Sequence, residues 1–212
     1  MIFVSIAEPT LKGCLDALKG AAAAEIRLDA MDVSEKDVEK IFQQKARLIA
    51  TCRPGSKSEG KRKSLLLAAI DAGAAYVDVE VDASDAYKNE IAKGAKARNC
   101  KIIVSYHNYE KTPGRAELDQ IVGWCFESGA DIAKIACKSN SDADNARLLG
   151  LLDTDRKMIV IGMGEKGKIT RIAAPLLGSE LTFASASKGK ETADGQIDSK
   201  KLEKLMGELE DA

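Results

Sequence analysis

The sequence predicts an α/β fold in which residues 1–212 form one domain, a closed (β/α)8 or TIM barrel of eight parallel strands, each followed by a helix. Eight short apolar runs alternate with amphipathic stretches, and most runs are too apolar to have one face in water, which is typical of parallel strands. Titratable residues interrupt five successive runs: Arg27, Arg53, Glu80, His107 and Lys134. Their separations of 26, 27, 27 and 27 residues match one strand plus one helix, so these side chains would meet at one mouth of a barrel.

The eight predicted strands are short and rich in aliphatic residues. They cover residues 2–6, 24–28, 47–51, 76–81, 101–106, 132–136, 158–162 and 181–184.

Between these runs, apolar residues recur at helical spacing. Leu11, Cys14, Leu15 and Leu18 show it after Pro9, and residues 202, 205, 206 and 209 show it near the C-terminus. The other helices are expected near residues 34–44, 61–72, 84–98, 114–128, 139–152 and 168–177. A doubly wound open sheet is the alternative arrangement of the same elements.

Composition excludes several classes of partner. Lys and Arg total 32 against 33 for Asp and Glu, so the net charge of −1 gives no general attraction to nucleic acid or to an anionic membrane. No apolar run approaches the ~20 residues of a membrane span, and the N-terminal apolar run has no basic segment before it, unlike a signal peptide. Five dispersed cysteines without a CxxC pair indicate reduced thiols in the cytoplasm, and with one histidine a zinc site is not expected.

Charged residues at the end of the second predicted strand form a polar lining. Glu25, Arg27 and Asp29 alternate with Ile26 and Leu28, so the two-residue period of a strand points all three charges the same way. In a barrel this is the end that carries the reactive residues. An ion-pair network at an exposed strand end is the alternative interpretation.

Lys134 is the strongest candidate for a reactive group, because it lies inside the apolar run Asp131 to Ala136. Burying an ammonium is costly, and interior lysines are uncommon unless they are paired or functional. Attack on a ketone at neutral pH requires the neutral amine, which burial or nearby positive charge favours, and Arg27, Arg53 and Arg171 are candidates for that charge. A lysine that extends to the barrel mouth and pairs with a carboxylate is the structural alternative.

His107, the only histidine, ends the apolar run that precedes Lys134 by one strand–helix unit. That position favours proton transfer to a substrate bound to the lysine. A lone histidine held by hydrogen bonds at a strand end is equally compatible with the local sequence.

One motif points to a different function. Residues 55–61, GSKSEGK, match the GxxxxGK part of a phosphate-binding loop, and the run 76–80, YVDVE, resembles the acidic strand of a nucleotide hydrolase. Arg62 replaces the Ser or Thr that would bind magnesium, and Glu59 would place negative charge among phosphates. Both departures argue against nucleotide binding.

Several longer motifs together resemble type I 3-dehydroquinate dehydratase, nearly from end to end. They are EIRLD at 25–29, which matches the family's ExRxD signature, TCRPGSKSEG at 51–60, SYHNYEKTP at 105–113, DIAKIA at 131–136, TRIAAPLLGSELTFAS at 170–185 and ADGQI at 193–197. ExRxD alone is a weak signal, whereas the set is specific.

This resemblance implies a homodimeric barrel that removes water from 3-dehydroquinate to give 3-dehydroshikimate in the shikimate pathway, with no metal or organic cofactor. By family position, Lys134 would form a Schiff base with the substrate ketone, and His107 would transfer protons. The iminium would act as an electron sink that acidifies the adjacent carbon, and Glu59 would orient the histidine.

The resemblance also implies binding residues. Arg171 would bind the substrate carboxylate, since a guanidinium offers two parallel hydrogen bonds. The other residues expected to contact substrate or to hold one another in place are Ser5, Glu25, Arg27, Arg53, Thr192 and Gln196. The polar segment 185–196 is a candidate lid, in which Thr192 takes a serine-like position and Asp194 stands where the family commonly has proline.

Two other functions remain compatible with a reactive lysine in a barrel. An aldolase would also use Lys134 but would break a carbon–carbon bond. A noncatalytic metabolite-binding barrel would keep the pocket without turnover, and ultraviolet absorbance of the conjugated product would distinguish it from a dehydratase.

Overall fold

Strands and helices alternate throughout the computed structural model, which describes residues 1–210. The strands are β1 (Ile2–Ile6), β2 (Ala23–Arg27), β3 (Arg47–Thr51), β4 (Tyr76–Glu80), β5 (Lys101–Asn108), β6 (Ile132–Lys138), β7 (Met158–Met163) and β8 (Thr182–Ser185). The helices that follow them are α1 (Leu11–Ala17), α2 (Glu35–Phe42), α3 (Glu59–Asp71), α4 (Asp85–Ala97), α5 (Arg115–Glu127), α6 (Asp142–Leu149), α7 (Lys168–Leu176) and α8 (Ser199–Glu210). Short 3₁₀ turns cover Leu28–Ala30 and Gly150–Leu152.

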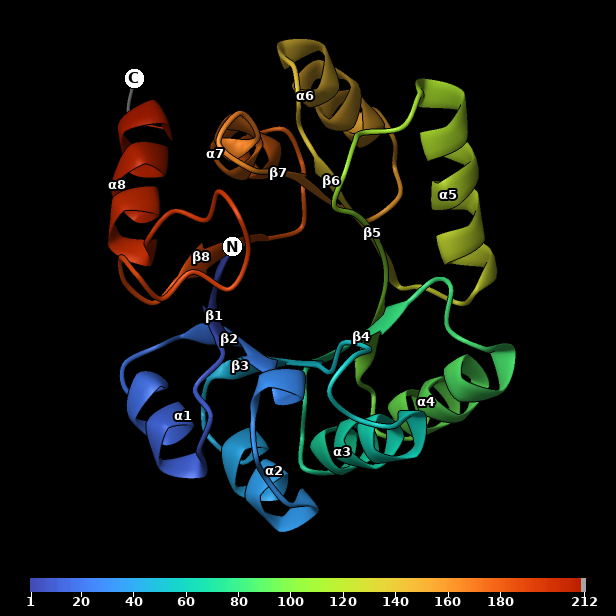
Figure 1. The fold of residues 1–212 in the computed structure, drawn as a ribbon, viewed down its shortest axis with the longest axis vertical. Coiled ribbons are helices and arrows are strands. Elements are labelled where there is room, and N and C mark those ends of the chain that lie inside the picture. Colours follow the sequence, from blue (N-terminus) through green and yellow to red (C-terminus); the bar gives the residue numbers. More distant parts are fainter. Residues whose placement is uncertain (211–212) are drawn as a thin grey trace.

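The strands form one parallel sheet in the order β7-β6-β5-β4-β3-β2-β1-β8, which curves into a nearly closed barrel. The Glu180 amide at the start of the β8 region donates to the Met158 carbonyl of β7 (2.9 Å), which brings the two ends of the order together. Helices surround the strands as a ring (Figure 1). The predicted single-domain (β/α)8 barrel is therefore confirmed, and the open sheet is not formed.

Two packed layers hold the barrel. Between sheet and helices, Ile26, Leu48, Leu65 and Ile91 belong to a continuous buried cluster. A separate cluster of inward-facing residues includes Phe3, Ile49, Tyr76, Ile103, Ile159 and Phe183. Because large side chains occupy the inside of the sheet, the barrel is a packed core rather than a pore, and polar groups collect at its end.

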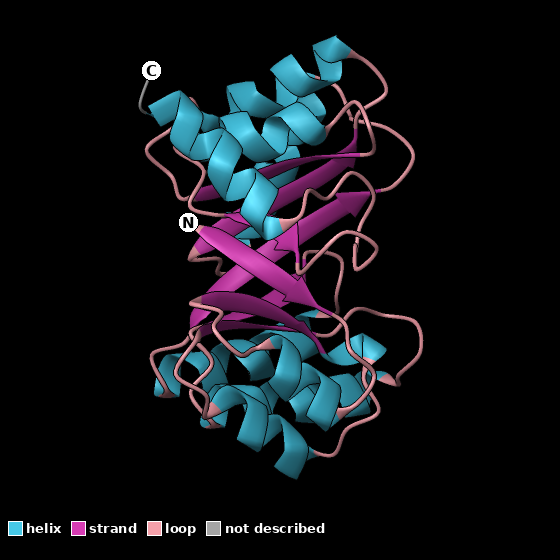
Figure 2. Cartoon of the chain, turned by 90° about the vertical axis from the view of Figure 1, so that its left-hand side faces the viewer, coloured by secondary structure: helices cyan, strands magenta, loops and turns pink. Residues whose placement is uncertain are grey.

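The polar end is defined by strand direction. The strands run the same way, and their carboxyl ends lie together on one side of the molecule (Figure 2). Serine side chains begin several helices on this side by accepting backbone hydrogen bonds, such as Ser58 at α3 and Ser141 at α6. No helix within residues 1–210 has the length and apolar character needed to cross a bilayer.

Element boundaries differ from the sequence predictions by a few residues, with two consequences for the site. Strands β5 and β6 each extend two residues beyond their predicted ends, and the extension of β5 brings His107 into the same regular ladder that holds Lys134. Strand β2 ends at Arg27, and Asp29 lies in a 3₁₀ turn instead of continuing the strand.

Candidate active site

Lys134 lies within β6 and points into the carboxyl end of the barrel. Its side chain is 5% exposed, and its Nζ is 3.0 Å from Asp78 Oδ2 and 4.0 Å from Glu25 Oε1. The ammonium also lies 4.5 Å from the centre of the Phe183 ring. A buried cation is thus held by a carboxylate and an aromatic face, which reduces the cost of its desolvation.

Asp78 is the centre of this charge network. It is fully buried on β4 and accepts two hydrogen bonds from Arg53, at 2.9 and 2.8 Å, and one from Ser105 at 2.6 Å. Burial alone would raise the pKa of Asp78, but the positive charges of Arg53 and Lys134 hold it well below its usual range. The carboxylate therefore stays ionised and fixes both cations.

His107 lies on β5, the neighbour of β6, two pairs along the ladder from Lys134. Ser105 pairs with Lys134 in register and His107 with Ala136. The imidazole stacks on Tyr109 with ring centres 6.0 Å apart, and burial, reinforced by the charges of Arg53 and Lys134, moves the pKa of His107 well below 6.5. The histidine is neutral at pH 7 and available as a base.

A pocket of about 320 Å³ lies beside these two residues. Eight of the ten side chains singled out in the sequence line it: Glu25, Arg27, Arg53, His107, Lys134, Arg171, Thr192 and Gln196. The structure brings together residues that are more than 170 positions apart in the chain. The pocket has the size of a small-metabolite site.

Arg171 lies near the start of α7, is 1% exposed, and makes no ion pair within residues 1–210. Its Nη1 and Nη2 donate to the carbonyls of Phe183 (3.3 Å) and Asp194 (3.1 Å), while Nε is buried without a partner in the described chain. Burial lowers the pKa of Arg171 to about 10 against the opposing effect of Glu25. Arg171 thus lines the pocket as a buried guanidinium without a countercharge, which is suited to an anionic ligand.

Glu25 and Arg27 are held by neighbours. Ser5 and Thr51 donate to the two carboxylate oxygens of Glu25 at 2.7 and 3.0 Å. Arg27 forms a two-point ion pair with Asp29 at 3.0 and 2.7 Å. Ser5 therefore positions a pocket carboxylate and does not itself line the pocket.

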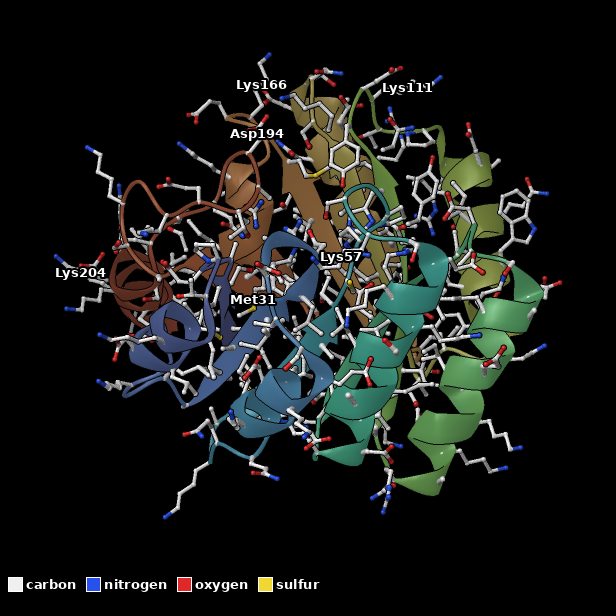
Figure 3. The ribbon with its side chains drawn as sticks, turned by 60° about the horizontal axis from the view of Figure 1, so that its bottom comes forward. Met31, Lys57, Lys111, Lys166, Asp194 and Lys204 are labelled. Atoms are coloured by element: carbon white, nitrogen blue, oxygen red, sulfur yellow. The ribbon has the colours of Figure 1, made fainter. Side chains whose placement is uncertain are left out.

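The segment between β8 and α8 covers one side of the pocket. The backbone amide of Thr192 and its hydroxyl both contact Gln196 Oε1, at 2.7 and 3.3 Å. Lys138 Nζ lies 3.5 Å from the Asp194 carboxylate, and Gly195 packs so closely on Gly164 that an added Cβ would lie 2.3 Å from its carbonyl oxygen. Figure 3 shows Asp194 along the same edge as Lys111 and Lys166, which belong to the loops after β5 and β7. The segment is seated on neighbouring loops at the barrel mouth.

Glu59 is the predicted catalytic residue that lies outside the pocket. It begins α3 with an exposed side chain, and the carboxylate beside His107 is Glu80, whose Oε1 is 3.7 Å from Nδ1. The sequence analysis also missed Asp78 as the partner of Lys134. The available signal is the alternation of Asp78 and Glu80 in the run YVDVE, because Glu80 is one of the five titratable residues expected at the barrel mouth and Asp78 points to the same side of the strand.

The residues of the phosphate-loop motif cap a helix and contact neighbouring loops and helices, and they do not form a nucleotide site. Ser58 caps α3, and Lys61 extends along the outside of the barrel to within 3.7 Å of Glu35. Lys57 donates to the Met31 carbonyl in the neighbouring loop at 2.7 Å, and Figure 3 labels both residues. Neither lysine lines the pocket.

Comparisons with known proteins agree with this geometry. A model of the family described as Type I 3-dehydroquinase matches residues 2–211. The 3-dehydroquinate dehydratase of Methanococcus vannielii is 40% identical over 227 aligned residues, which cover 99% of this chain and 100% of the relative. That of Desulfotalea psychrophila is 35% identical over 92% of each chain. A crystal structure of type I 3-dehydroquinate dehydratase from Clostridium difficile with covalent modified comenic acid superposes with a TM-score of 0.87, at 27% identity, over 99% of this chain and 92% of its own.

Proposed function

Because the chain belongs to the type I 3-dehydroquinase family and is a 3-dehydroquinate dehydratase, we propose that its elimination of water proceeds through Lys134, His107 and Arg171. The observation that carries this assignment is the pocket itself. It places a buried lysine, a neutral histidine and an arginine without a carboxylate partner around about 320 Å³. The substrate has one group for each: a ketone, an acidic carbon and a carboxylate.

Lys134 supplies the nucleophile. A proton passes from the Nζ ammonium to His107, and the neutral amine attacks the ketone carbon. The carbinolamine hydroxyl then takes that proton and leaves as water, which gives an iminium. The ammonium and the iminium both carry one positive charge, so Asp78, 3.0 Å from Nζ, stabilises the resting lysine and the covalent intermediate alike. The covalently modified ligand in the Clostridium difficile relative supports covalent chemistry in this barrel.

His107 supplies the base and then the acid. The C–H bond next to the iminium breaks, an N–H bond forms on the imidazole, and the electron pair enters the iminium to give an enamine. The same proton then passes to the β-hydroxyl, the C–O bond breaks, and water leaves. Hydrolysis of the imine releases 3-dehydroshikimate and regenerates the amine of Lys134.

Arg171 binds the substrate carboxylate. Its unpaired, buried Nε and its position on the pocket wall support this role, because an anion there would complete a guanidinium that the protein leaves without a countercharge. Arg27, Arg53, Glu25, Thr192 and Gln196 contact the substrate hydroxyls or hold one another around them.

Borohydride trapping tests the assignment. Incubation with 3-dehydroquinate and borohydride, followed by peptide mass spectrometry, should map one reduced adduct to Lys134. Lys134→Ala should abolish it. Lys138→Ala is the matched control, because Lys138 lines the same pocket and its removal should leave the adduct on Lys134. An adduct that persists on the Lys134→Ala variant would overturn the assigned nucleophile.

His107→Ala should slow turnover by about 10²- to 10⁴-fold, the usual contribution of a general acid or base, while the adduct still accumulates. Unimpaired turnover, followed by absorbance of the conjugated product, would exclude His107 from proton transfer.

The assembly and location of the protein are further proposals. A homodimer is implied by the family resemblance, and it would cover apolar side chains that α7 and its end leave exposed, at Ile169, Leu176 and Leu177. Light scattering should then give twice the 22.7 kDa chain mass. All five cysteines are free and buried, which supports a reducing cytoplasmic environment.

A further inference from the structure

Five cations line the substrate pocket, and they fall into two groups. Three of them pair with carboxylates of the barrel, namely Arg27, Arg53 and Lys134. The other two, Lys138 and Arg171, have no ion pair with a barrel carboxylate in the described chain. Both instead contact one residue of the lid segment, Asp194, which also lines the pocket. The cations that the barrel leaves unpaired are therefore the ones that hold the lid.

Lys138 is directed toward the lid by its surroundings. It ends β6 on the same side of the strand as Lys134, which precedes it by four residues. Its stem lies against Gly164, where an added Cβ would be 3.0 Å from Cε and 2.9 Å from Nζ. The backbone amide of Gly164 also donates to the Asp194 carbonyl at 3.1 Å. The lysine and the lid residue are thus seated on one glycine, and Nζ comes within 3.5 Å of the Asp194 carboxylate.

Asp194 brings a negative charge to a pocket that takes an anion. Its carbonyl accepts from Nη2 of Arg171 at 3.1 Å, and the substrate carboxylate would bind beside it, at Nε of the same guanidinium. The closed lid would therefore place two carboxylates in one pocket, and their repulsion would oppose closure. A cation beside Asp194 offsets this repulsion, and Lys138 is the residue whose ammonium contacts that carboxylate.

We propose that Lys138 is a positioning residue that neutralises Asp194 and so allows an acidic lid to close over an anionic substrate. In the closed complex, Lys138 and Arg171 balance two negative charges, that of Asp194 and that of the substrate. The ion pair is partly in water, with 33% and 80% of the two side chains exposed, so it adds little to the stability of the fold. Its effect falls on substrate binding instead. This inference rests on the proposed binding of the substrate carboxylate at Arg171.

Removal of the two charges, singly and together, tests this role. Lys138→Met keeps the stem against Gly164 and leaves Asp194 uncompensated, so KM for 3-dehydroquinate should rise about fivefold or more, with kcat changed less than about threefold. Addition of Asp194→Asn to that variant should return KM to within about twofold of the parent value, because the repulsion is then absent. Asp194→Asn alone leaves an extra cation in the pocket and should lower KM about twofold. Lys138→Arg, which keeps the charge, should restore the KM of the parent protein.

Salt and a second lysine provide the controls. At about 1 M salt the screening length falls to about 3 Å, so the ratio of KM between Lys138→Met and the parent, both at that salt, should approach one. Lys166→Met removes a lysine along the same edge as Asp194 (Figure 3) that does not line the pocket, and KM should stay within about twofold of the parent value. Borohydride trapping at Lys134 with saturating substrate shows that the site of each variant is folded.

Two results would overturn the inference. One is an unchanged KM in Lys138→Met. The other is a double variant that binds substrate no better than Lys138→Met, which would mean that the lysine contacts the substrate itself. Failure of the proposed function looks different: Arg171→Met would then keep the KM of the parent protein, whatever the Lys138 variants show.

Discussion

Replacement of Arg171 by methionine should weaken substrate binding without weakening the fold. Methionine keeps most of the apolar stem and removes the guanidinium. At pH 7 the guanidinium is charged in both the folded and the unfolded chain, so the whole cost of its burial is present. The fall of its pKa from 12.5 to about 10 corresponds to about 3 kcal/mol against folding.

Removal of the buried charge should stabilise the fold, but the loss of two hydrogen bonds opposes this gain in stability. Arg171 donates to the carbonyls of Phe183 and Asp194, and each bond contributes about 1 kcal/mol. The difference leaves Arg171→Met about 1 kcal/mol more stable than the parent protein. Binding moves the other way, because two charge-assisted hydrogen bonds to a carboxylate contribute about 4 kcal/mol, or about 10³ in kcat/KM.

Urea unfolding, with and without product, measures both the change in fold stability and the change in ligand binding. Product should raise the unfolding midpoint of the parent protein and leave that of Arg171→Met unchanged. Arg62→Met is the matched control, since Arg62 is also buried but packs against Tyr87 outside the pocket, and kcat/KM should change less than about threefold. A loss of more than about 2 kcal/mol in the Arg171 variant, with kcat/KM nearly unchanged, would refute the reasoning and make Arg171 a structural residue.

Three further perturbations follow from the same geometry. Asp78→Asn removes the nearest countercharge of both Lys134 and Arg53, so urea unfolding should show a loss of about 3 to 5 kcal/mol, and a loss below about 1 kcal/mol would contradict the network. Gly195→Ala places a Cβ 2.3 Å from the Gly164 carbonyl at a φ of +75°, so KM should rise about tenfold while the Lys134 adduct still forms, and an unchanged KM would show that this segment is not a lid. Because the pKa of His107 is lowered, its base form persists as pH falls, and kcat/KM should decline only well below pH 6.5; a decline centred at or above 6.5 would contradict the placement of the ring.

The sequence predicted the barrel and most of the pocket because both depend on periodicity. A strand and helix of constant combined length bring Arg53, His107 and Lys134 to one end, and no knowledge of side-chain contacts is needed. The partners of these residues depend on register and on loop paths. Asp78 on β4 reaches Lys134 on β6 across the intervening strand β5, and Glu59 turns to solvent because Ser58 begins a helix there. The sequence pattern YVDVE places Asp78 on one side of its strand, but no pattern in one sequence identifies its partner.

Charge balance links the substrate carboxylate to the lid. Asp78 neutralises the cations around Lys134, while Arg171 is held only by backbone carbonyls, one of which belongs to Asp194. A carboxylate bound at Nε and Nη2 would share Nη2 with that carbonyl, because this nitrogen carries two hydrogens, and the shared nitrogen links binding at Arg171 to the position of the lid. Since the acceptor is the backbone, the side chain at 194 can vary without loss of this link. The aspartate at position 194 makes an exposed ion pair with Lys138, an interaction of about 0 to 1 kcal/mol, which offsets its negative charge near the anionic substrate.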